Sequence, residues 1–441
     1  MQATDETRLT LTQAAALLQR RELSPLELTD AYLRRIERLN PHLNAYVTVT
    51  AERAREDARR ATEQLGAGAS RGPLHGVPIA LKDLYDTAGI RTAGGAKILA
   101  DRVPGADATA ARRLREAGTV LLGKLNTHEL AFGVTTTNPH FGATRNPWDP
   151  ERIPGGSSGG AGAAVAAGLA AATLGTDTGG SIRIPASLCG CVGLKPTYGR
   201  VSKAGVLPLS RLLDHAGPLT ATVEDAARLL QVVAGYDPDD GSTVPVPVPD
   251  YAAALGEGVR GLRVGVPRGY FFDRLDDEVR SAVERALGVL HDLGAELHEV
   301  AVPDFGPIAL PAFGLAVADL LDLYGEQRGA ERVLERLPRT QVGREREGAD
   351  ELGQPGLRVA HAAGVRHRRS IRQDDRPALG RPRGGRATRA ALGARTPGRR
   401  RNAGRSRHRP RAKGVSRPPR SGGGRRPANA GRGGRPPGGA V

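Results

Sequence analysis

Cysteines and long hydrophobic runs are scarce in this sequence. Its two cysteines, Cys189 and Cys191, are separated by one residue, which is too close for an ordinary disulfide, and no second pair completes a zinc site. The longest apolar stretch, residues 161–174, is mostly Ala and Gly and is shorter than the roughly 20 residues that span a bilayer. We therefore expect reduced structural cysteines, no bound metal, no membrane partner and a buried core helix over 161–174. The N-terminal residues lack the basic and apolar segments of a signal peptide, so a cytoplasmic location is expected.

Acidic and basic residues are distributed unevenly along the chain. The net charge of the 441 residues is +17, but residues 341–441 hold 27 Lys and Arg against 6 Asp and Glu, so that residues 1–340 carry a net charge of −4. The C-terminal segment is rich in Arg, Gly, Pro and Ala, and no aromatic residue follows Tyr324. Such a composition buries too little apolar area to offset the entropy cost of ordering. We expect a folded domain over 1–340 and a disordered basic tail over 341–441.

Two interpretations of this tail are open. One is an arginine-glycine arm that binds nucleic acid with an affinity that falls steeply with salt, and the other is a GC-rich coding sequence read out of frame. The second is favoured because the helix-like run 330–337 stops without a domain-closing strand, and no spaced Arg-Gly-Gly repeat follows it. On this hypothesis a short base slip lies near codon 340, the folded domain is incomplete at its C-terminus, and a nucleic-acid partner is not expected.

Helical and strand patterns alternate through the first 340 residues. Residues 24–27 read Ser-Pro-Leu-Glu, a capping box with proline at the first helical position, and they predict an amphipathic helix running to about Asn40. Apolar strands are predicted at 77–82, which ends on Lys82, and at 119–123, and a further helix is predicted over 223–234. This alternation predicts an α/β fold with a substantial sheet.

Two glycine-rich blocks each contain a candidate catalytic serine. Residues 154–160 read Pro-Gly-Gly-Ser-Ser-Gly-Gly around Ser157, and residues 175–186 place Ser181 after two glycines. Glycine lets the backbone approach a substrate closely, so that successive N–H groups converge on a developing oxyanion. The residues that we expect to bind the oxyanion or the substrate are Thr178, Gly179 and Gly180, next to Ser181.

A serine nucleophile needs a base, and Lys82 is the candidate. No histidine in this region offers itself, whereas Lys82 stands at a strand end beside Asp83. Burial disfavours the ammonium form and lowers the pKa of a lysine, so a desolvated Lys82 can accept a proton from a serine, directly or through a second hydroxyl such as that of Ser157. Considered alone, Lys82 would be a solvated surface lysine, and each serine block alone would be a turn.

Two other motif matches are disfavoured. Residues 156–160 fit the Gly-x-Ser-x-Gly elbow, with Ser158 as nucleophile and Asp214 and His215 downstream, but adjacent Asp and His side chains rarely converge on one site. Residues 118–124 have the spacing of a phosphate loop, but Leu125 replaces the required hydroxyl residue.

Three blocks together resemble the amidase signature family. They are residues 77–83 around Lys82, residues 154–160 and the Gly-Gly-Ser-Ile-Arg block at 179–183. Supporting blocks lie at 123–129, 145–149 and 189–200, so that the resemblance covers roughly residues 7–340. It implies a large mixed β-sheet covered by helices on both faces.

The resemblance also implies roles for individual residues. Ser181 would be the acyl-forming nucleophile, Ser157 a relay serine that follows a cis peptide bond after Gly156, and Lys82 the base and later the acid. Supporting residues would be Ser158, Asp177 and Arg183, of which the last two would brace the nucleophile loop, although an ion pair of purely structural value explains them equally well.

The implied reaction is hydrolysis of a small-molecule amide through an acyl-enzyme, without metal or organic cofactor. Within the family, the alternative to a free-standing amidase is the glutamine-hydrolysing A subunit of a tRNA-dependent amidotransferase, which releases ammonia from glutamine for a partner protein. Ile184 and the run 135–140 look closer to general amidases. A homodimer is an option that the sequence leaves open. Because relatives continue with further sheet and pocket elements where the tail stands, we expect part of the substrate pocket to be missing.

Overall fold

The computed structural model describes residues 5–303 and 305–325. All of the described residues belong to one compact unit. The predicted basic tail and the helix-like run 330–337 lie outside the described residues, so the domain boundary near 340 stays a prediction.

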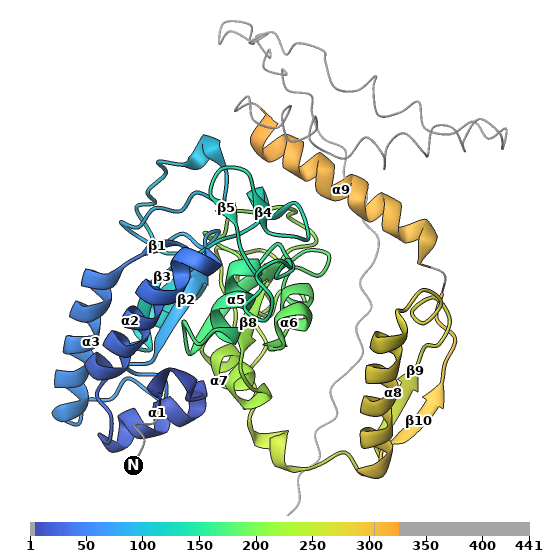
Figure 1. The fold of residues 1–441 in the computed structure, drawn as a ribbon, viewed down its shortest axis with the longest axis horizontal. Coiled ribbons are helices and arrows are strands. Elements are labelled where there is room, and N and C mark those ends of the chain that lie inside the picture. Colours follow the sequence, from blue (N-terminus) through green and yellow to red (C-terminus); the bar gives the residue numbers. More distant parts are fainter. Residues whose placement is uncertain (1–4, 304, 326–441) are drawn as a thin grey trace, which may run out of the picture. The chain divides into compact units, whose positions relative to one another are not determined.

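A six-stranded mixed sheet forms the centre of the described unit (Figure 1). Its strand order is β1-β3-β2-β6-β8-β7. The parallel pairs are β2–β3 and β2–β6, while β1–β3, β6–β8 and β7–β8 are antiparallel. The strand bounds are β1 Tyr46–Val49, β2 Pro78–Lys82, β3 Val120–Leu125, β6 Ala172–Asp177, β7 Val192–Gly193 and β8 His215–Thr220. The predicted α/β fold with a large mixed sheet is confirmed.

Helices pack against this sheet, and the first long one begins where the capping box predicts. The Ser24 hydroxyl accepts a hydrogen bond from the Glu27 N–H, while the Glu27 carboxylate accepts one from the Ser24 N–H, and Pro25 is the first helical residue. The helices are α1 Leu11–Arg20, α2 Pro25–Leu43, α3 Ala51–Gly66, α4 Thr109–Glu116, α5 Gly159–Ala166, α6 Arg183–Cys189, α7 Val223–Val233, α8 Asp277–Asp292 and α9 Gly306–Tyr324. The helices α2, α3, α5 and α7 contact the sheet strands.

The apolar stretch 161–174 is not one helix, so that prediction is wrong. Helix α5 ends at Ala166, and the strand β6 begins at Ala172. Gly168 has φ +67°, and the Leu169 N–H donates to the Ala164 carbonyl, which closes the helix with a left-handed glycine. A run of Ala and Gly fits a buried helix and a buried strand equally well, because it carries no periodic polar face.

The parallel strands β2 and β6 position the site. Leu81 of β2 pairs with Leu174 of β6. Since parallel strands end at the same edge of a sheet, Lys82 at the end of β2 comes beside the last residues of β6, Thr176 and Asp177. All residues of both strands are buried, as expected for central strands of an α/β sheet.

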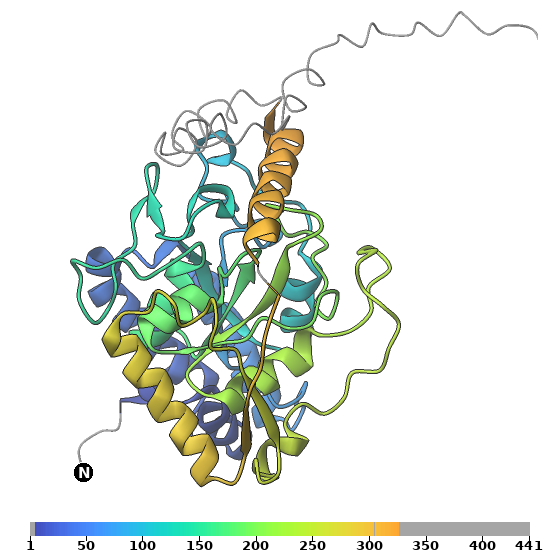
Figure 2. The same ribbon diagram turned by 90° about the vertical axis from the view of Figure 1, so that its right-hand side faces the viewer.

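Two smaller sheets complete the described elements. The strands β9 Arg263–Val266 and β10 Glu296–Glu299 are parallel and are joined by α8 in a βαβ unit (Figure 1 and Figure 2). The strands β4 Thr137–Asn138 and β5 Gly142–Ala143 form a short antiparallel pair.

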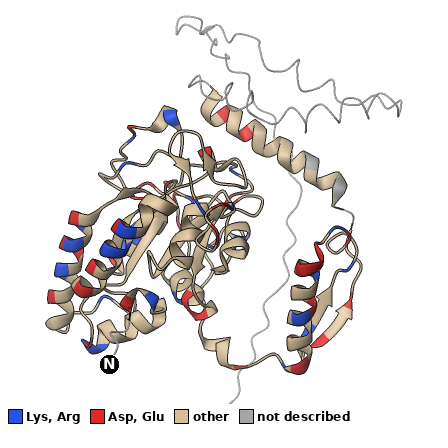
Figure 3. Ribbon diagram, in the orientation of Figure 1, with Lys and Arg blue, Asp and Glu red and all other residues tan. Residues whose placement is uncertain are grey.

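Helix α9 is apolar along most of its length, and Figure 3 shows few charged residues on it. Pro307–Tyr324 is long and apolar enough to cross a membrane, as core helices of soluble proteins also can be. This segment is not one uninterrupted apolar run in the sequence, because Asp319 and Asp322 lie within it. Leu320 and Tyr324 pack into a buried cluster with residues such as Leu130, so the C-terminal part of α9 contacts protein.

Candidate active site

Lys82 is completely buried at the end of β2. Its Nζ atom donates hydrogen bonds to Ser157 Oγ and Thr176 Oγ1, both at 2.8 Å. Burial lowers the pKa of Lys82 to about 7, against the opposing attraction of Asp214 and Asp177, which raises it. A large fraction of this lysine is therefore neutral near pH 7 and able to accept a proton.

Ser157 is held rigidly beside this lysine. Its side chain is buried, and its carbonyl accepts hydrogen bonds from the His128 N–H at 3.0 Å and the Thr127 hydroxyl at 2.9 Å. The Gly156–Ser157 peptide bond is cis, as the resemblance implied. A Cβ atom on Gly156 would lie 2.8 Å from the Thr135 nitrogen, so only glycine allows this close passage of two backbone segments.

Ser181 lies in the loop between β6 and α6, next to the loop of Ser157. The Ser158 N–H donates to the Ser181 carbonyl at 3.2 Å, which joins the two loops. Ser181, Thr178 and Gly179 line a cavity of about 930 Å³. The structure thus brings Lys82 and Ser157 into direct contact and places Ser181 on a neighbouring loop at a cavity wall.

Asp177 and Arg183 hold the loop around Ser181 in shape. The Asp177 carboxylate accepts hydrogen bonds from the Gly180 N–H at 2.8 Å and the Ile182 N–H at 3.1 Å, and Arg183 donates to it at 2.9 and 3.0 Å. Burial alone would raise the pKa of Asp177, but the hydrogen bonds from Arg183 and Ile182 outweigh it and hold the pKa below its usual range. The ion pair with Arg183 and the hydrogen bonds that brace the loop therefore use the same Asp177 carboxylate.

The Gly180 N–H is therefore already bound. Sequence reasoning placed Gly180 among the groups that bind the oxyanion or the substrate, but its N–H points to the Asp177 carboxylate. Its φ of +137° and the 2.8 Å between an added Cβ and Ile184 Cδ1 explain the glycine as a requirement of the turn. The N–H groups of Gly179 and Ser181, on either side of it, are the better candidate donors.

Ser158 occupies a structural position. Its hydroxyl donates to the Thr176 carbonyl at 3.1 Å and accepts from the Thr176 N–H at 3.3 Å, so it fastens the serine loop to β6. Asp214 and His215 are engaged elsewhere: Thr178 donates to Asp214, and the His215 ring lies 2.7 Å from the Leu213 carbonyl. This arrangement disfavours the Gly-x-Ser-x-Gly elbow.

The phosphate-loop match is a chance one. Residues 120–125 form the buried strand β3. The Lys124 ammonium is buried and donates to the Tyr85 carbonyl and the Thr92 hydroxyl, both at 2.6 Å. Its side chain is therefore a structural link between the strand and a neighbouring loop.

Sequence reasoning did not connect Thr176 with Lys82, and it considered Asp214 only as a partner of Ser158. Thr176 contacts Lys82 only because of the register between β2 and β6, and Asp214 reaches Thr178 from a segment 36 residues away in the chain. Thr176 lies inside the glycine-rich block 175–186, so its hydroxyl could have been considered as a hydrogen-bond partner of Lys82.

The cavity beside Ser181 is largely apolar. Phe132 and Phe313 both line it, and their rings contact each other with centroids 5.6 Å apart. Its apolar lining comprises Ala131, Phe132, Val134, Leu209, Leu213, Ala309, Ala312, Phe313 and Ala316, and His128 and Glu129 are its titratable residues among those that the structure describes. The size suits a small molecule.

Neither cysteine is part of this cavity. Both are free thiols, and the buried Cys189 Sγ lies 3.3 Å from the Pro154 carbonyl oxygen. Within residues 5–303 and 305–325, no three His, Cys, Asp or Glu side chains gather as they would around a metal ion.

An amidase family model matches residues 27–348. The chain belongs to the amidase signature family, which confirms the resemblance. Among curated relatives, the A subunit of glutamyl-tRNA(Gln) amidotransferase from Trichlorobacter lovleyi is 54% identical over 286 residues, which cover 65% of this chain and 59% of the relative. The same protein from a Roseiflexus species is 52% identical over 307 residues, covering 70% and 63%. The chain thus spans about 60% of the length of these relatives.

Solved structures include both types of relative. The A subunit of glutamyl-tRNA(Gln) amidotransferase from Thermotoga maritima matches with a TM-score of 0.64 and 35% identity over 80% of this chain and 72% of that one. The peptide amidase from Stenotrophomonas maltophilia matches with a TM-score of 0.66 and 36% identity over 73% and 69%.

Proposed function

We propose that this chain hydrolyses a carboxylic amide through an acyl-enzyme, with Ser181 as nucleophile, Ser157 as relay and Lys82 as base. The observation that carries the proposal is the completely buried Lys82, whose Nζ lies 2.8 Å from Ser157 Oγ on the loop that adjoins Ser181. A neutral amine and two hydroxyls in a water-poor site are the groups that serine activation without histidine requires.

The first half of the reaction forms the acyl-enzyme. Ser181 Oγ attacks the amide carbon while its proton passes to Ser157, whose own proton passes to the neutral Lys82. The N–H groups of Gly179 and Ser181 stabilise the oxyanion of the tetrahedral intermediate. The carbon–nitrogen bond then breaks as Lys82 returns the proton through Ser157 to the leaving nitrogen, which departs as ammonia or an amine.

The second half restores the enzyme. Water attacks the acyl carbon and gives up a proton through the same relay, the ester bond to Ser181 breaks, and Ser181 regains its proton as the acid leaves. Every step uses protein groups and water, so the proposal includes no cofactor. The cytoplasmic location expected from the sequence stays a prediction.

Two substrates are supported by different observations. The curated relatives, at about 50% identity, are named as amidotransferase subunits, and they favour glutamine, with ammonia passing to a partner protein. The apolar lining around Phe132 and Phe313 favours instead a neutral amide with an apolar acyl group, as for a free-standing amidase.

The homodimer and the nucleic-acid arm stay predictions, and the arm lies outside the described residues.

A comparison of L-glutamine with hexanamide separates the two candidates. We expect the purified full chain to release ammonia from glutamine, measured in a coupled assay, because the relatives favour this substrate. Faster release from hexanamide, by about tenfold or more, would identify the free-standing amidase, since each buried methylene contributes about 0.8 kcal/mol. Release that is no faster than that of a Ser181→Ala control with either amide contradicts the proposed function.

A further inference from the structure

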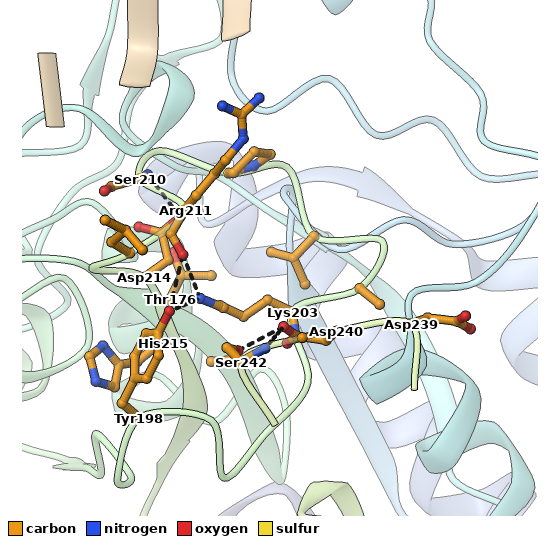
Figure 4. A pocket seen from close by; sticks show the side chains of 16 residues that line it. Thr176, Tyr198, Lys203, Ser210, Arg211, Asp214, His215, Asp239, Asp240 and Ser242 are labelled. Carbon is orange, nitrogen blue, oxygen red and sulfur yellow. Dashed lines mark hydrogen bonds between the residues drawn. The ribbon is translucent and has the colours of Figure 1, made fainter. Parts of the chain in front are cut away.

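The segment between Leu207 and β8 carries a buried carboxylate whose hydrogen bonds converge from two loops. Asp214 is 8% exposed. Its Oδ1 accepts from the Thr178 hydroxyl at 2.5 Å, and its Oδ2 accepts from the Leu209 N–H at 2.8 Å. The same Oδ2 accepts from the N–H of Ser210 at 3.1 Å, and Figure 4 shows Ser210 beside Asp214. Asp214 therefore fixes Thr178, the first residue of the loop that carries Ser181.

Asp214 also stands between two cavities. With Thr176 and Lys203 it lines a second cavity of about 500 Å³ (Figure 4), whereas its partner Thr178 lines the larger cavity beside Ser181. Since Thr176 accepts a hydrogen bond from Lys82, Asp214 lies close to both the nucleophile loop and the surroundings of the base.

The charges around Lys82 give Asp214 a second effect. The titratable groups that face Lys82 are the carboxylates of Asp214 and Asp177 and the imidazole of His128. Asp177 is paired with the guanidinium of Arg183, so much of its charge is compensated at short range. Asp214 exerts the largest attraction on the Lys82 ammonium, and its carboxylate is bound by neutral donors.

The surroundings of Asp214 itself include charged and titratable groups. Burial raises the pKa of Asp214, and the hydrogen bonds from Thr178, Leu209 and Ser210 and the charge of Lys203 act in the opposite direction. Burial raises the pKa of the Tyr324 phenol of α9, and the charge of Asp214 adds to that rise.

Helix α9 holds this segment in place. The Ser210 hydroxyl donates to Asp319 Oδ2 at 2.6 Å, and the Arg211 N–H donates to the same oxygen at 3.1 Å. The Tyr324 hydroxyl donates to the Pro208 carbonyl at 2.9 Å. Because Ser210 also donates its N–H to Asp214, two hydrogen-bonded steps connect α9 to Asp214.

We propose that Asp214 is a positioning residue of the amide hydrolysis: it holds Thr178 of the nucleophile loop in place and supplies the anionic field in which Lys82 changes charge. Asp319 of α9 keeps the Asp214 segment docked. This inference rests on the proposed function of Lys82 and Ser181 and adds a residue to it.

The test uses Asp214→Asn, which keeps the size of the side chain and removes its charge. We expect kcat to fall by about 10- to 100-fold, because a displacement of about 1 Å in a reacting loop has effects of that size. Removing an anion disfavours the protonated form of Lys82, so the pH at which activity reaches half its maximum moves down by roughly one unit.

Thr178→Val separates the two effects. This variant loses the hydrogen bond but keeps the Asp214 charge, so kcat falls while the pH midpoint stays in place, and Thr178→Ser restores kcat. The readout is the rate at which a fluorophosphonate labels Ser181 as a function of pH, alongside kcat and KM. It needs no knowledge of the natural amide.

The outcomes distinguish this inference from the proposed function. If the wild-type chain is not labelled at Ser181, the proposed function fails. If the wild-type chain is labelled and Asp214→Asn shows the same midpoint and the same kcat, the inference alone is overturned. A lower melting temperature of Asp214→Asn with an unchanged midpoint and kcat also overturns it, because a structural role would account for that result.

Discussion

Ser181→Ala is expected to lower kcat for amide hydrolysis by about 10⁴-fold or more, down to the background rate. Ser181 supplies the oxygen that forms the acyl-enzyme, and neither Ser157 nor Ser158 can replace it, because both are completely buried and only Ser181 of the three lines the cavity. The measurement is ammonia release at saturating amide, with circular dichroism to show that the variant is folded.

Ser158→Ala is the matched control for this prediction. It removes a hydroxyl from the adjacent loop that fastens the backbone to β6, so it should reduce stability more than the chemical step. The reverse result, a severe loss in Ser158→Ala and near-normal activity in Ser181→Ala, would support the Gly-x-Ser-x-Gly alternative and refute the assignment of Ser181.

Lys82→Met is expected to lower kcat/KM by about 10³-fold and to remove one limb of the pH profile. The wild-type rate should rise with pH through the pKa of Lys82, about 7, because only the neutral amine accepts the proton of Ser157. The variant lacks the amine whose deprotonation produces this limb, so its residual activity improves with pH only through hydroxide. The measurement is kcat/KM from pH 5.5 to 9.5.

The thermal stability of Lys82→Met tests whether burial is what lowers the pKa of Lys82. Burial depresses the pKa of Lys82 from 10.5 to about 7, so between these values the unfolded chain binds more protons than the folded one, and the free energy of unfolding rises with pH. At pH 7 and below, the full cost of burying the lysine is present. Methionine removes it, so Lys82→Met should melt a few degrees higher at pH 7, which is a trade of stability against activity.

The exposed Lys97 supplies the matched control. Lys97→Met removes a lysine from the surface and should change neither the pH profile nor the melting temperature appreciably. A wild-type profile that is flat between pH 6 and 8, or a Lys82→Met profile with the same rising limb, would show that Lys82 is not the base.

The chemistry of the site was more accessible from the sequence than its geometry. Lys82, Ser157 and Ser181 stand in short blocks of glycine and strand residues, so each block indicates local backbone chemistry without knowledge of the fold. Asp177 and Arg183 are also local, since both serve the same turn. Their roles as catalytic and supporting residues rest on the experiments proposed above.

Contacts that depend on register or on distant segments were not accessible. Thr176 meets Lys82 through the pairing of β2 with β6, and Asp214 meets Thr178 through the path of the segment before β8. No local pattern specifies either contact, although the Thr176 hydroxyl itself stands in the block 175–186. The division of 161–174 into a helix and a strand was missed for a related reason, because Ala and Gly fill buried helices and buried strands alike.

The central claim is that protons pass from Ser181 through Ser157 to Lys82 while an acyl group is carried on Ser181. Acid-quenched turnover of a p-nitrophenyl ester of hexanoic acid, followed by peptide mass spectrometry, examines it most directly. We expect one hexanoyl group on the peptide that contains Ser181, formed much more slowly in Ser157→Ala and Lys82→Met. An acyl group on another residue, or equal rates in all three proteins, would contradict it.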